Sequence, residues 1–196
     1  MGLEIVGSRV LSPYFGSSIF VWGSLISVFL GSLSLGYLLG GKLADRYPHF
    51  TTLSLLVLAA GLLIWLIPLV SNPIILFLVN LGLGSRPAPL VASLSIFFLP
   101  SMLLGTVSPY AVRLRATDIA RMGNVSGGLY AISSAGSILG TLLTAFALIP
   151  LIGVRIIFLC LGATLLILSG LGSAVLNLKK GQAVMEEECP IQGPLA

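Results

Sequence analysis

The sequence predicts an all-α, polytopic membrane protein with about six transmembrane helices. Only 8% of its 196 residues are charged and 57% are hydrophobic, whereas a soluble domain carries about 25% charged residues. Stretches without any charge, such as residues 53–72 and 130–153, have the roughly 20 residues that a helix needs to cross the hydrocarbon core. The alternation over ~10 residues that marks a transmembrane β-barrel is absent from the sequence.

The expected elements begin with a short apolar segment at residues 3–15, which contains Glu4 and Arg9. At about 1.5 Å per residue it covers only part of a bilayer. We therefore expect an interfacial helix or the distal part of a spanning helix whose start is missing. Longer spans are predicted at residues 19–43, 51–70, 89–112, 127–149 and 154–178.

Two further features interrupt these spans. The apolar piece at residues 74–83 is too short to cross a membrane, so we expect an interfacial or re-entrant loop there. Pro100 and Pro109 remove backbone hydrogen bonds within the 89–112 segment, and we expect both to kink that helix.

The distribution of charge predicts the orientation. With alternating crossings, Arg86 and Arg155 lie on one side, and the other side carries Lys42, Arg46, Arg113, Arg115, Arg121, Lys179 and Lys180. The positive-inside rule places the larger group and the C-terminus in the cytoplasm. We expect a helical membrane domain over residues 1–180 and a disordered cytoplasmic tail over residues 181–196. Because the cations are dispersed at helix ends, we expect no nucleic-acid partner.

Several strings resemble a known family. The stretch Gly41-Lys42-Leu43-Ala44-Asp45-Arg46 resembles the Gly-x-x-x-Asp-Arg loop signature of the major facilitator superfamily, although the basic residues that follow in that signature are absent here. Residues 4–18, 98–105 with 108–114, and 128–141 are similar to the membrane domain fused ahead of spermidine-synthase-like aminopropyltransferase domains in bacteria. The resemblance covers residues 2–178 and implies half of a major-facilitator-type bundle in a bacterial inner (plasma) membrane, with a truncated first helix. The synthase domain that often follows in this family is absent from this sequence, so we expect no aminopropyltransferase activity.

The candidate substrate-binding residues are Glu4, Tyr110, Tyr130, Ser133 and Ser134. A carboxylate within a membrane segment attracts a cation or carries a proton, but a position near water would leave Glu4 without a special role. The hydroxyls either line a cavity or bond to their own helix backbone. Arg9 is expected to pair across helices, to bind a lipid headgroup or to extend outward to the interface.

The candidate gating residues are Asp45, Arg46, Gly36, Gly40 and Gly41. The resemblance implies that Asp45 meets a neighbouring helix end and locks one conformation. The alternative is a local pair with Lys42. The glycine spacing, repeated at Gly136 and Gly140, permits close helix packing, which is either static or a sliding contact.

A single half of such a bundle needs a partner, and the simplest partner is a second copy related by a two-fold axis. The sequence therefore predicts a homodimeric transporter-like domain. Its cargo class, a polyamine or related cation, is implied by the family resemblance. The alternatives are a non-transporting membrane anchor or scaffold for a spermidine-synthase-like domain, and a lipid-interacting regulatory domain. We expect no cofactor and no metal site.

Overall fold

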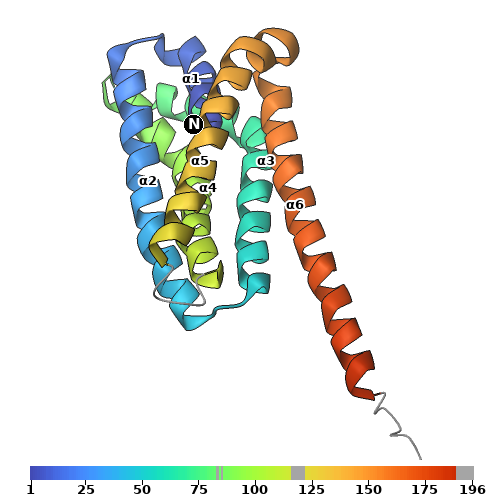
Figure 1. The fold of residues 1–196 in the computed structure, drawn as a ribbon. Helices are drawn as coiled ribbons and strands as arrows, with labels where there is room; N and C mark the ends of the chain where they lie inside the picture. Colours follow the sequence, from blue (N-terminus) through green and yellow to red (C-terminus); the bar gives the residue numbers. More distant parts are fainter. Residues whose placement is uncertain (83, 85, 116–121, 189–196) are drawn as a thin grey trace, which may run out of the picture.

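The computed structural model describes residues 1–82, 84, 86–115 and 122–188, and every regular element in these ranges is helical (Figure 1). The prediction of an all-α chain is therefore confirmed for the described residues. The elements are α1 (Gly2–Phe15), α2 (Ile19–Arg46), α3 (Phe50–Asn80), α4 (Pro87–Arg115), α5 (Met122–Leu142), the π-helical η2 (Leu143–Leu148) and α6 (Ile149–Glu188).

Four helical stretches of the described chain are long and apolar enough to cross a membrane: Ile19–Arg46, Phe50–Asn80, Pro87–Arg115 and Ser126–Ser173. The last of these bends sharply, because Gly153 has φ 75° and ψ 159° within otherwise helical residues. Glycine adopts such a positive φ without steric cost. The chain reverses direction at this bend (Figure 1), so the predicted spans 127–149 and 154–178 form its two legs.

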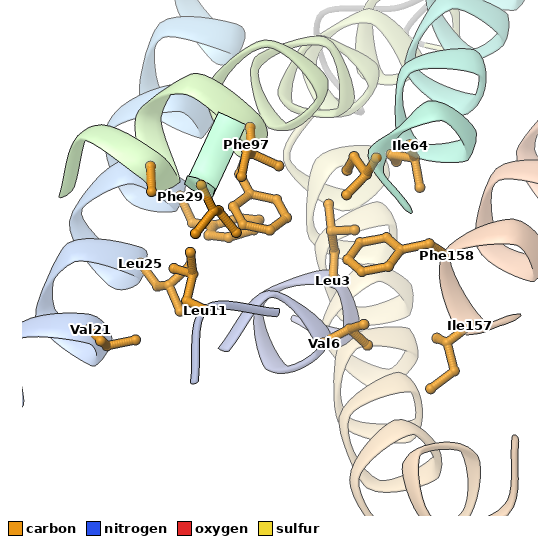
Figure 2. Close-up of a cluster of buried hydrophobic side chains, with 14 of the residues drawn as sticks. Leu3, Val6, Leu11, Val21, Leu25, Phe29, Ile64, Phe97, Ile157 and Phe158 are labelled. Atoms are coloured by element: carbon orange, nitrogen blue, oxygen red, sulfur yellow. The ribbon is translucent and has the colours of Figure 1, made fainter. Parts of the chain in front are cut away.

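The first helix, α1, is packed into the bundle. Leu3, Val6 and Leu11 are buried in a cluster with side chains of α2, α3, α4 and α6 (Figure 2). A Cβ on Gly2 would lie 3.0 Å from the Thr144 Oγ1 atom of η2. Close packing of these side chains stabilises the position, since van der Waals contact is what holds helices together within a bilayer. Accordingly α1 is a core element, although it is too short to span a bilayer.

Aromatic rings join the helices that surround α1. The ring centroids of Phe29 (α2) and Phe97 (α4) lie 5.5 Å apart, and those of Phe97 and Phe158 (α6) lie 6.4 Å apart. Both separations lie within the range of favourable aromatic contacts. The row of rings therefore ties three helices that are distant in sequence.

One sequence prediction is wrong: residues 74–80 form the last turns of α3 and not a separate loop. The helix continues to Asn80 through Pro68 and Pro73, which membrane helices tolerate. Ile75 and Leu78 are buried in the core cluster, so tertiary packing favours continuation of the helix. The α4 helix also continues through Pro100 and Pro109, and the kinks expected there stay predictions.

The α6 helix continues to Glu188, into the segment for which the sequence predicts disorder. Alanine, glutamine, methionine and glutamate, which are good helix formers, make up most of residues 182–188. Residues 189–196 of that predicted tail lie outside the described part of the chain.

Small residues bring α2 and α4 into backbone contact. Ser32, Gly36, Gly40 and Ala44 are buried at every fourth position of α2. A Cβ on Gly36 would overlap the carbonyl oxygen of Met102, and one on Gly40 would lie 2.6 Å from the Cα of Thr106. A side chain fits at neither position, so both glycines are required by the close approach.

We expect Gly36→Ala to lower the free energy of unfolding by about 1–3 kcal/mol, because the added methyl group overpacks the contact with Met102. Gly41 is the matched control, since a Cβ there meets no atom within 4 Å. Gly41→Ala should leave stability unchanged or raise it slightly through helix propensity. Denaturant titration of the detergent-solubilised protein measures both variants, and equal stability of the two would contradict the assignment.

Candidate functional site

An ion pair that includes Asp45, one of the predicted gating residues, joins the ends of α2 and α4. Arg113 Nε donates a hydrogen bond to Asp45 Oδ1 at 3.1 Å, so the partner of Asp45 is a neighbouring helix and not Lys42. The Asp45 side chain is 72% exposed and that of Arg113 is 48% exposed. Exposed ion pairs contribute little to stability. The pair is thus a weak contact that a conformational change can break at small cost.

Other predicted residues lie near the same end. The guanidinium of Arg46 lies 5.7 Å from the centroid of the Tyr47 ring, a cation–π arrangement. Tyr110 is fully buried, and its hydroxyl donates to the carbonyl oxygen of Tyr47, with the carbonyl oxygen of His49 at 3.3 Å. Tyr110 therefore ties α4 to the α2–α3 connection and lines none of the described cavities.

Two serines join α3 to α6 through a pair of hydrogen bonds, here called the clasp. Ser54 Oγ donates to the carbonyl oxygen of Ser169 at 2.8 Å, and Ser169 Oγ donates to the carbonyl oxygen of Ser54 at 2.7 Å. Both serines are buried. Nearby, a Cβ on Gly162 would lie 2.7 Å from the Cβ of Trp65, so small residues again allow close packing.

A cavity of about 420 Å³, here called the serine cavity, lies beside this clasp. Its polar lining consists of Ser54, Ser108, Ser133 and Ser169, and most of the remaining lining is aliphatic. Four helices contribute to it, namely α3, α4, α5 and α6. A weakly polar cavity of this kind offers hydroxyl donors and acceptors but no charge.

Residues 130–136 of α5 are exposed on all sides of the helix, and the polar and small residues Tyr130, Ser134 and Gly136 among them are here called the α5 face. Tyr130 is 58% exposed, and the other two are exposed as well. A Cβ on Gly136 or Gly140 would meet no atom within 4 Å. Within the described residues, no helix packs against the Cβ position of either glycine, although a Cβ on Gly2 would lie 3.5 Å from the carbonyl oxygen of Gly140.

Glu4 lies on α1, where it is half-buried and forms no ion pair with a described residue. The structure thus does not gather the five predicted substrate residues in one cavity. Ser133 lines the serine cavity, Tyr130 and Ser134 lie on the α5 face, Tyr110 is enclosed beside the α2–α3 connection, and Glu4 belongs to α1.

The sequence did not identify the residues of α4 that face the α2 glycines, or the residues that join α3 to α6. Gly105 and Thr106 receive the glycines of α2, and Ser54, Ser169, Gly61 and Gly162 build the α3–α6 contact. A small or hydroxyl residue within an otherwise apolar span was the available signal. That signal identifies candidates but does not say which helix they meet.

Comparison of the chain with protein-family models, with curated proteins and with solved structures gives no match.

We expect Ser54→Ala and Ser169→Ala each to lower the free energy of unfolding by about 1 kcal/mol. The losses in the double variant should be close to additive, because each hydroxyl donates to a backbone carbonyl that the other substitution leaves in place. Ser95→Ala is the control, since the exposed Ser95 hydroxyl bonds to Val91 in its own helix. Unfolding titrations compare the four variants, and a loss in Ser54→Ala and Ser169→Ala no larger than that in Ser95→Ala would argue against the clasp.

Proposed function

We propose that the chain is one half of a membrane transporter and that two copies together form the transport unit. The observation that carries this proposal is the α5 face, where polar and small residues of a membrane helix are left uncovered. The resemblance to half of a major-facilitator-type bundle is its second support. The finer expectation of about six membrane helices belongs to the same proposal.

The hydroxyls of the membrane helices differ in how they are satisfied. Ser93, Ser95 and Thr164 each donate to the carbonyl four residues earlier, the usual arrangement for hydroxyls in membrane helices. Among the described residues Ser134 has no such bond and is exposed on α5, whereas Ser133 lines the serine cavity. An unsatisfied hydroxyl is unfavourable in hydrocarbon. A second copy, or water in a pathway between two copies, would satisfy it.

Polyamines or related cations are the proposed cargo class, from the family resemblance and from Glu4. Among the described side chains, the carboxylates are those of Glu4 and Asp45, and only Asp45 has a cationic partner. An unpaired carboxylate within a membrane domain suits a cation pathway. We place the protein in the bacterial inner (plasma) membrane with a cytoplasmic C-terminus, since Lys42, Arg46, Arg113 and Arg115 share one end of the bundle.

Uptake of labelled spermidine into proteoliposomes tests the transport function. We expect flux above that of empty liposomes, and about tenfold less flux for Glu4→Gln, because the carboxylate that attracts the cation is lost. Glu4→Asp should restore part of the flux. Arg86→Gln serves as a charge-changing control outside the α5 face. Absence of flux in the unmodified protein would refute the proposal.

Disulfide crosslinking tests the pairing of two copies. In a background without Cys160 and Cys189, we expect Ser134→Cys on the α5 face to form a crosslinked dimer in membranes. Leu30→Cys on α2 is the control, since Leu30 is 60% exposed on a different helix. Crosslinking at Leu30→Cys but not at Ser134→Cys would place the dimer contact elsewhere.

The second candidate is the membrane anchor or scaffold, favoured by the extent of α6. Figure 1 shows this helix extending well beyond the ends of the other helices. From Gly153 to Glu188 it is about 50 Å long at 1.5 Å per residue, which exceeds the roughly 30 Å hydrocarbon core. A stiff projection of this kind would hold an attached domain at a set distance from the bilayer.

A further inference from the structure

A second cavity combines two arginines from different helices. It has a volume of about 340 Å³ and lies where α1, α3 and the part of α6 that follows Gly153 meet. We call it the arginine cavity, and its polar lining is formed by Arg9, Tyr14, Ser71, Asn72 and Arg155. It lies toward the end of the bundle opposite the Asp45–Arg113 pair (Figure 1).

The charge of this cavity is uncompensated within the described chain. Guanidinium groups remain protonated in proteins, and no carboxylate is among the residues that line the cavity. Neither Arg9 nor Arg155 forms an ion pair with a described residue. Two like charges at one cavity repel each other, and a bound anion would relieve that repulsion.

The remaining polar groups add hydrogen-bond donors. The Tyr14 hydroxyl donates to Asn72 Oδ1 at 3.0 Å, which leaves the Asn72 amide N–H groups available as donors. The Ser71 side chain supplies a hydroxyl at the same cavity. Guanidinium, amide and hydroxyl donors together match the oxygens of a phosphate group, for which arginine has a suitable planar geometry.

The break at Gly153 contributes a backbone element. A new helical leg begins after this residue, and Val154 and Arg155 of its first turn line the cavity. The first N–H groups of a helix lack intrahelical acceptors, and the helix dipole places partial positive charge there. Both effects favour an anion. The bend that creates the hairpin thus also orients a helix start toward the two arginines.

One wall of the cavity is apolar, formed by Val10, Pro68 and Phe158. Both arginines are exposed, so the cavity is open to the surroundings of the bundle. We propose that the arginine cavity binds a phosphate group, carried either by a membrane lipid headgroup or by a phosphate free in solution. Arg9 also borders a cavity of about 280 Å³ between α1 and α2. We assign the phosphate to the arginine cavity because a second guanidinium, that of Arg155, lines it as well.

Ligand titration of the purified full chain in neutral detergent tests this site. The probes are short-chain phosphatidylglycerol and inorganic phosphate, with binding followed by microscale thermophoresis. We expect saturable binding that weakens about tenfold in Arg9→Gln and in Arg155→Gln, because each loses a charge-assisted contact. Arg86→Gln is the matched control: it removes a cation that lies 5.7 Å from the centroid of the Phe20 ring, away from the cavity.

The two probes distinguish the source of the phosphate. Saturable binding of phosphatidylglycerol without saturable binding of inorganic phosphate assigns a headgroup site, and saturable binding of inorganic phosphate with the higher affinity assigns a site for free phosphate. Saturable binding of neither probe overturns the proposal, as does an equal loss in Arg86→Gln. Circular dichroism and gel filtration verify folding of each variant. Arg9→Lys and Arg155→Lys, which keep the charge but lose the planar fork, should bind with intermediate affinity.

Discussion

The backbone contact between α2 and α4 is the constraint on which the rest of the bundle depends. Gly36 and Gly40 let these helices approach until Met102 and Thr106 occupy the space of the missing side chains. In lipid, apolar side chains gain nothing by leaving their surroundings, so packing at short distance supplies the stabilisation that the hydrophobic effect supplies in water. The position of α4 then sets that of Phe97, and through it the contacts of α1 and α6.

The two ends of the bundle have different electrostatic properties. One end carries a paired contact, in which Arg113 meets Asp45 across two helix ends. Toward the other end, Arg9 and Arg155 share a cavity without a described acidic partner. A paired charge is available as a conformational lock, whereas unpaired cations are available to a ligand. The proposed phosphate site therefore does not depend on the proposed transport of cations.

Polar groups within the apolar spans fall into two classes. The hydroxyls of Ser54 and Ser169 are satisfied by each other's backbone and hold α3 to α6. Ser133 lines the serine cavity, and Ser134 is exposed on the α5 face. The same residue type is therefore a structural element on one helix and an open surface on another, and its role is decided by the helix opposite to it.

Composition and hydropathy alone determined the class of protein and the place of the long spans, because each depends on local sequence. The cross-helix partner of Asp45 was one of two alternatives until the structure placed Arg113 beside it. Residues 74–80 were assigned wrongly because continuation of a helix through Pro73 depends on packing around Ile75 and Leu78. Only the tertiary structure places Arg9 and Arg155 at one cavity and joins Ser54 to Ser169, since hydropathy does not report which helices become neighbours.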